Sequence, residues 1–116
     1  LSGCYRIESL AFLENNASLT SLTLMGCKQL KDIDFVQTCP YITNITLNSC
    51  MNIADFNCLA NCQSLTNISI KNCKQIADFT FLAKCPSLSN VNLINCKRID
   101  AETNKTMIER NVDISQ

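Results

Sequence analysis

Hydrophobic positions recur along this chain at a constant interval of 23 residues. Within each interval, hydrophobic residues alternate with polar ones, as in Leu22-Thr-Leu24 and Ile45-Thr-Leu47. Alternation with a period of two predicts a short strand that buries every second side chain. A constant interval of about 20 to 50 residues is typical of a solenoid, in which each unit packs against its neighbours. The pattern therefore predicts a row of parallel strands, one per unit, about 4.8 Å apart.

A cysteine follows each strand phrase and returns at the same interval. The residue before it is glycine, serine or asparagine, and glycine and asparagine tolerate positive φ best, so we expect the chain to bend there. The cysteine should point inward at that bend, where its thiol can donate to a backbone carbonyl of a neighbouring unit. This structural ladder comprises Cys4, Cys27, Cys50, Cys73 and Cys96, and the bend column before it comprises Gly3, Gly26, Ser49, Asn72 and Asn95.

The second half of each unit leaves about 10 residues before the next strand, which is too few for a long helix. We expect a 3-10 helix or a one-turn helix in this segment. An aspartate recurs before it, at Asp32, Asp55 and Asp78, and suits the capping of a tight turn. An aromatic column should point inward from these helices, and it consists of Phe12, Phe35, Cys58 and Phe81.

The end of the chain departs from the repeat. Asp100 suits the N-cap of a helix over residues 101–110, in which Met107 and Ile108 are expected to cover the open end of the core. Residues 112–114 predict either one more strand or a frayed tail. The chain thus divides into a repeat array of about four to five units over residues 1–99 and a cap helix with a tail over residues 100–116.

The N-terminal end has no equivalent cap, so we expect residues 1–7 to be the weak end of the array. An unpaired strand edge with an exposed Leu1 would favour end-to-end contact between copies of the chain. The chain also begins in the middle of a repeat phrase, which suggests a piece of a larger protein.

The aligned columns resemble leucine-rich repeats, and the phrase L-x-x-L-x-L-x-x-C, as in Leu19–Cys27, is similar to the cysteine-containing subtype with its units shortened to 23 residues. The resemblance covers about residues 1–99. It implies an α/β solenoid: a right-handed superhelix with a parallel β-sheet on its concave face, 3-10 or one-turn helices on its convex face, and a C-terminal capping helix. Residues 73–78 and 85–88 are similar to the repeats of F-box ubiquitin-ligase adaptors, whereas residues 32–36 resemble the short convex turns of bacterial internalins.

The outward side chains of the stacked strands form the concave face that solenoids use for binding. Here that face is small, polar and nearly neutral, without the aromatic and arginine anchors of most hot spots. Two interpretations stay open: the face binds a protein partner, or it is a solubilising surface whose side chains satisfy one another across strands. The residues concerned are Ser21, Thr23, Met25, Asn44, Thr46, Asn48, Asn67, Ser69, Lys71, Asn90, Asn92 and Ile94.

Basic residues gather just after the cysteine column, at Lys28, Lys74, Lys97 and Arg98. Such a basic rim could meet an acidic peptide or a phosphate backbone, but a solvated charged edge is the interpretation we favour. The whole chain carries 10 basic and 10 acidic residues, a formal net charge of zero, which argues against a nucleic-acid partner.

The nine cysteines are interpreted as free, buried thiols, because their number is odd and Cys58 occupies a column of phenylalanines, where it acts as a small hydrophobic residue. Free thiols indicate a reducing compartment, so we expect an intracellular, cytoplasmic location. The sequence shows no signal peptide, and no apolar stretch is long enough to insert into a membrane.

Catalysis finds little support in this sequence. It contains no histidine, its two glycines both belong to the bend column, and Cys58-x-x-x-Cys62 fits structural columns better than a metal site. We therefore predict no catalytic residue, no metal and no cofactor. The predicted function is a non-catalytic protein–protein interaction module within a larger protein. The alternatives are a self-assembling structural solenoid and the substrate-recognition arm of an F-box-type ubiquitin ligase adaptor.

Overall fold

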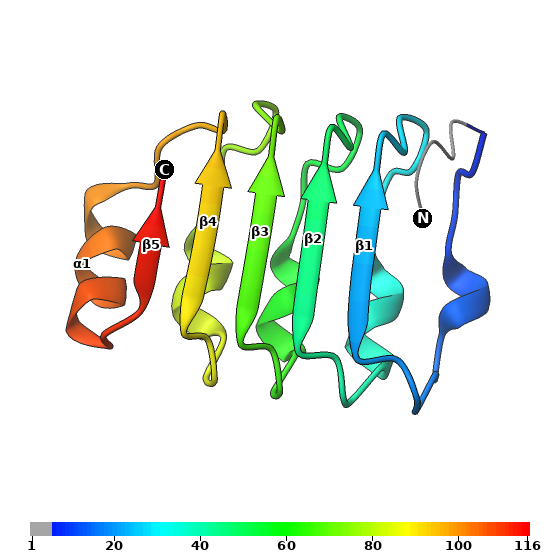
Figure 1. The fold of residues 1–116 in the computed structure, drawn as a ribbon, viewed down its shortest axis with the longest axis horizontal. Helices are drawn as coiled ribbons and strands as arrows, with labels where there is room; N and C mark the ends of the chain where they lie inside the picture. Colours follow the sequence, from blue (N-terminus) through cyan, green and yellow to red (C-terminus); the bar gives the residue numbers. More distant parts are fainter. Residues whose placement is uncertain (1–5) are drawn as a thin grey trace.

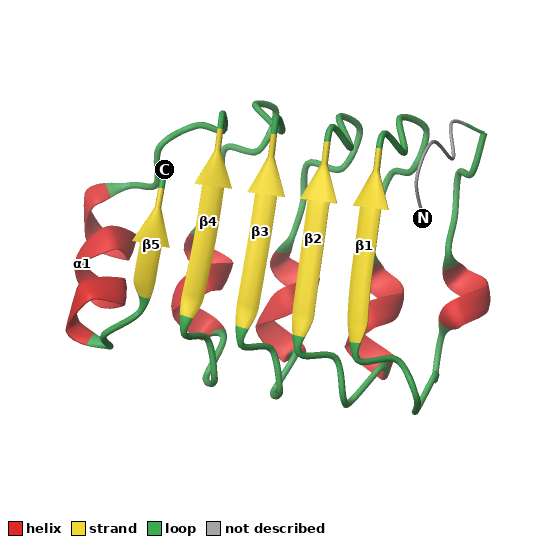
Figure 2. Ribbon diagram, in the orientation of Figure 1, coloured by secondary structure: helices red, strands yellow, loops and turns green. Residues whose placement is uncertain are grey.

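Parallel strands in a single row form one layer of the molecule (Figure 1). The structure is a computed structural model that describes residues 6–116. Its sheet has the strand order β1-β2-β3-β4-β5, and short helices lie behind it as a second layer (Figure 2). The strands are β1 (Ser21–Met25), β2 (Asn44–Asn48), β3 (Asn67–Lys71), β4 (Asn90–Ile94) and β5 (Asp113–Ser115). The predicted solenoid of parallel strands is confirmed.

The register of the sheet equals the interval of the sequence. Leu24 pairs with Leu47, and Leu47 pairs with Ile70, so residues 23 positions apart stand side by side. Each of these three side chains is fully buried. Because one residue of slip would turn the hydrophobic positions to solvent, the alternation along the strands fixes this register.

The bend after each strand uses a left-handed backbone conformation, as predicted. The φ angle is 67° at Gly26, 59° at Ser49, 55° at Asn72 and 56° at Asn95. Glycine and asparagine adopt this region at the lowest cost, which explains the composition of the column. The bend turns the next residue, the ladder cysteine, into the core.

The second layer consists of four 3-10 helices, η1 (Ala11–Leu13), η2 (Asp34–Thr38), η3 (Asn57–Asn61) and η4 (Thr80–Lys84). The predicted aspartates cap three of them: the carboxylates of Asp32, Asp55 and Asp78 accept the N–H of the first helical residue at 3.1, 2.8 and 2.9 Å. Hydrogen bonds from Thr80 lower the pKa of Asp78. These caps end the irregular segment before each helix at the same place in every unit.

The aromatic column is buried in three units and exposed in one. Phe35, Cys58 and Phe81 lie in the core, but Phe12 is 75% exposed, so its predicted inward position is wrong. The reason lies in the direction of packing. The Phe81 ring lies 5.9 Å from the ring of Phe56, which belongs to the preceding unit. Within residues 6–116 no helix precedes η1, so Phe12 has no such neighbour to pack against.

A helix and a final strand close the C-terminal end of the stack (Figure 1). Helix α1 (Ala101–Glu109) begins as predicted after Asp100, whose side chain accepts the N–H of Thr103 at 3.0 Å. Met107 is completely buried, whereas Ile108 is 64% exposed and does not cover the core. Consecutive helical residues point about 100° apart, so only one of these two can face inward.

The residues after α1 return to the sheet. Strand β5 pairs with β4 in register, with Asp113 beside Asn90, so the prediction of one more strand holds and the frayed tail does not. The side chain of Arg110 donates to the carbonyls of Ala83 and Cys85 and ties the cap to the helix layer. The edge expected to be weak, including Leu1, lies for the most part outside the described residues.

Candidate functional site

The strand face, by which we mean the outward side of β1–β5, carries three rows of side chains across the sheet. All twelve predicted binding residues lie on it, at the first, third and fifth positions of β1–β4. On β2 and β3 these side chains are half-buried, because strands flank them on both sides. On β1 they are exposed. The rows follow from the register, which places residues 23 apart next to one another.

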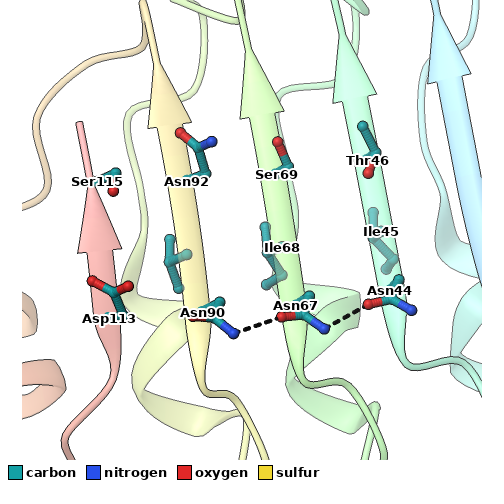
Figure 3. Close-up of a pocket in the computed structure, with 11 residues that line it drawn as sticks. Asn44, Ile45, Thr46, Asn67, Ile68, Ser69, Asn90, Asn92, Asp113 and Ser115 are labelled. Carbon is teal, nitrogen blue, oxygen red and sulfur yellow. Dashed lines mark hydrogen bonds between the residues drawn. The ribbon is translucent and has the colours of Figure 1, made fainter.

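The first row is an asparagine ladder (Figure 3). The side-chain amide of Asn67 donates to Asn44 Oδ1 at 2.6 Å, and that of Asn90 donates to Asn67 Oδ1 at 2.9 Å. Asn44 in turn donates to Ser21 Oγ at 3.4 Å. Every bond runs toward the N-terminal unit, so the ladder has a direction. These side chains are held in place rather than free to adapt.

The second row contains shorter side chains and one unsatisfied group. It runs through Thr23, Thr46, Ser69 and Asn92 and ends at Ser115. Asn92 Oδ1 is buried, and no donor contacts it within the described part of the chain. A buried acceptor without a donor costs roughly 1–3 kcal/mol of desolvation, so such a group in a surface cavity marks a place for a ligand donor.

The third row is mixed in character. Met25 is 42% exposed and Ile94 is 45% exposed at its two ends, and Asn48 and Lys71 lie between them. Asn48 Oδ1 accepts from Asn72 Nδ2 at 2.9 Å and from Ser49 Oγ at 3.1 Å, so this amide belongs to the bend rather than to the open face. The apolar ends of this row are the largest exposed contact area on the strand face.

A shallow cavity of about 400 Å³ hollows the strand face over β2–β5 (Figure 3). Members of the first two rows line it, together with two residues that sequence reasoning missed, Asp113 and Ser115. The signal was available, since these two residues lie one interval of 23 after Asn90 and Asn92. The cap helix between β4 and β5 breaks the repeat and concealed the continuation.

The predicted basic rim does not gather into one site. Lys28, Lys74, Lys97 and Arg98 are all exposed near the bends, but only Lys74 lines a cavity there. That cavity has a volume of about 580 Å³ and includes Met51 and Gln75. Gln75 donates to the carbonyls of Cys50 and Ile53 at 3.0 and 2.7 Å, so it is a structural residue that joins two units.

Cysteines form two columns of hydrogen bonds in the core. In the predicted ladder, Cys50 and Cys96 donate to carbonyls of the preceding unit, Leu24 O at 3.7 Å and Ile70 O at 3.4 Å. Cys27 and Cys73 instead contact carbonyls of their own units, and Cys4 lies outside the described residues.

A second cysteine column joins the units more regularly than the first. Cys39, Cys62 and Cys85 each reach back 26 residues, to the carbonyls of Leu13, Val36 and Leu59 at 3.5, 3.8 and 3.4 Å. Each of these carbonyls lies in or at the end of the preceding 3-10 helix, where helical carbonyls lack an internal partner. The predicted role of cysteine in joining units therefore applies to both columns.

Burial makes these thiols poor nucleophiles. Desolvation raises the pKa of Cys50 and Cys85 to about 11 and that of Cys58 and Cys62 to about 12. The thiolate is the reactive form, so its fraction at pH 8 falls to about a thousandth or less. Within residues 6–116, no group of three histidine, cysteine, aspartate or glutamate side chains could hold a metal ion.

We expect iodoacetamide at pH 8 to modify Cys58 and Cys62 in the folded protein at least about 100-fold more slowly than in the chain unfolded by guanidinium. The half-buried Cys96 should react before them. Mass spectrometry of the alkylated peptides measures each rate. Equal rates for Cys58 in the folded and unfolded chains would contradict its placement in the core.

A comparison with known families now bears on this architecture. The family model for BspA type leucine-rich repeat regions matches residues 1–109 in six copies. The chain belongs to this leucine-rich repeat family. No curated protein matches it.

Membership agrees with the geometry described above. A leucine-rich repeat stacks parallel strands on one side and short connecting segments on the other, as β1–β5 and η1–η4 do here. Leucine-rich repeat domains generally bind proteins and are typically non-catalytic. Within the described residues, no helix has the length and apolar composition needed to cross a membrane.

Proposed function

We propose that this leucine-rich repeat domain is a non-catalytic module of a larger protein and that it binds a protein partner through its strand face. The observation that carries the proposal is the cavity over β2–β5, which contains the buried, unpaired Asn92 Oδ1. A surface that only keeps the protein soluble has no need to retain such a group, because its desolvation penalty is recovered only when a donor reaches it.

The arrangement of the strand face supports this proposal. The asparagine ladder fixes the first row, so a partner meets side chains whose conformations are already ordered, and less entropy is lost on binding. The exposed Met25 and Ile94 flank the polar centre with apolar area. The polar rows would provide specificity and the apolar ends would provide contact area.

Selection of peptides from a displayed library on the immobilised protein tests the proposal. We expect the replacement Ser69→Tyr, which fills the centre of the cavity, to weaken binding of the selected peptides by at least about tenfold. Asn57→Tyr is the matched control, because Asn57 is exposed on η3 in the opposite layer. Peptides that bind wild type and Ser69→Tyr equally would contradict the proposal.

We also propose that the chain belongs to the cysteine-containing subtype of leucine-rich repeats and functions in a reducing, intracellular compartment. The support is the burial of seven cysteines, which act as hydrogen-bond donors between or within units in the thiol form. A disulfide would remove those donors. Thiol counts on the unfolded protein isolated from its native source test this proposal, and fewer than nine free thiols would contradict it.

A further inference from the structure

The asparagine ladder ends at a residue that cannot continue it. Each asparagine donates its amide to the preceding unit and offers its oxygen to the next. The next position after Asn90 is Asp113, its register partner on β5. A carboxylate has no N–H to donate, so Asn90 Oδ1 and the Asp113 carboxylate are two neighbouring acceptors without a donor between them. Figure 3 shows Asp113 next to Asn90 in the row, with no bond joining them.

A third acceptor lies in the neighbouring row. Asn92 Oδ1 is buried and unpaired, and Figure 3 shows this oxygen on the side of Asn92 that faces β5. Asn92 stands two residues after Asn90, and side chains two apart on a strand point to the same face. Asn90, Asn92 and Asp113 thus form an acceptor cluster on β4 and β5, with Ser115 beside it in the second row.

The protein does not neutralise this cluster itself. Asp113 is the one charged side chain among the described residues that line the cavity. Arg110, three residues earlier, donates to the carbonyls of Ala83 and Cys85 instead. Within residues 6–116, no basic side chain forms an ion pair with Asp113, and no donor contacts its carboxylate. The cluster therefore combines a negative charge with unused hydrogen-bond acceptors.

We propose that the acceptor cluster binds an arginine side chain of the partner protein. A guanidinium carries five N–H donors in a plane and can bond a carboxylate and a neighbouring amide oxygen at once. Its charge complements Asp113, and hydrogen bonds between ionised groups are about twice as strong as neutral ones. This inference rests on the proposed function, since it names a residue that the partner presents to the strand face.

An NMR titration with a small probe tests the cluster without requiring a partner. The probe is N-acetylarginine amide at low salt, and the control is N-acetylcitrulline amide, which is nearly isosteric but uncharged. We expect the arginine probe to shift the side-chain amide signals of Asn90 and Asn92 and to bind at least about tenfold more tightly than the citrulline control. Signals of Asn57, on the opposite layer, should not move.

The replacement Asp113→Asn provides the matched variant. It supplies the N–H that the ladder lacks at this position, so we expect the variant to fold with a Tm equal to or above that of wild type. It should lose the arginine-specific shifts. Equal binding of arginine and citrulline probes, undiminished arginine binding by Asp113→Asn, or replacement of the probe by micromolar Ca²⁺ would each overturn the inference.

The two proposals fail in different experiments. Library peptides that lose binding with Ser69→Tyr but keep it with Asp113→Asn would support the strand face as a binding surface and overturn the arginine site. Arginine-specific shifts at Asn90 and Asn92, combined with peptides that ignore Ser69→Tyr, would support the cluster while contradicting the wider proposal.

Discussion

Replacing Phe81 with alanine is expected to lower the free energy of unfolding by about 3–5 kcal/mol, as for buried aromatic residues in general. Phe81 is fully buried, and its ring lies 5.9 Å from Phe56 and 6.3 Å from Phe79. The replacement therefore leaves a cavity between two units, where neighbouring repeats derive their stability from contact with each other. Guanidinium titration followed by circular dichroism measures the change.

The matched control stands in the same column of the repeat. Phe12 occupies the equivalent position of an earlier unit but is 75% exposed. We expect Phe12→Ala to change the free energy of unfolding by less than about 0.5 kcal/mol. If both replacements destabilise the protein equally, the packing of each aromatic residue toward the preceding unit is wrong.

Replacing Met107 with alanine is expected to cost about 2–5 kcal/mol. Met107 is the buried side chain through which α1 covers the end of the core, and it is completely inaccessible to solvent. The end unit contacts a neighbour on one side only, so its loss should appear first as local opening of α1 and β5. Hydrogen exchange at the amides of Val112 and Asp113, which bond to Met107 O and Ser89 O, measures that opening.

The adjacent Ile108 provides the control for this experiment. It is 64% exposed, and we expect Ile108→Ala to leave both exchange and stability almost unchanged. Faster exchange at Val112 in Ile108→Ala than in Met107→Ala would show that the other face of the helix forms the cap.

The fold could be predicted from the sequence because local and repeating signals agree. The alternation in Leu22-Thr-Leu24 specifies a strand, the interval specifies its register, and the bend column specifies a left-handed turn. The errors concern Phe12 and Ile108, which both lie at the ends of the stack. A column alignment assumes that each unit has neighbours on both sides, and this assumption fails where the described stack ends.

The candidate site could be predicted in its outline and not in its chemistry. A period of two places Asn44, Asn67 and Asn90 on one face without further information. Which amide donates and which oxygen remains unpaired depends on side-chain orientations across several strands, and sequence alone does not supply them. Asp113 was missed because α1 replaces the regular connection before it, although its position still matches the interval of 23 residues.

The one-way direction of the asparagine ladder has a consequence for how such a chain can change in length. Each asparagine needs a neighbour only one unit away on either side. Gene duplication or deletion of a whole 23-residue segment between Asn44 and Asn90 would therefore leave every amide with the same partners. A gain or loss of any other length would break the row. Descendants of this gene should differ by complete units, while the aspartate at the end keeps its place.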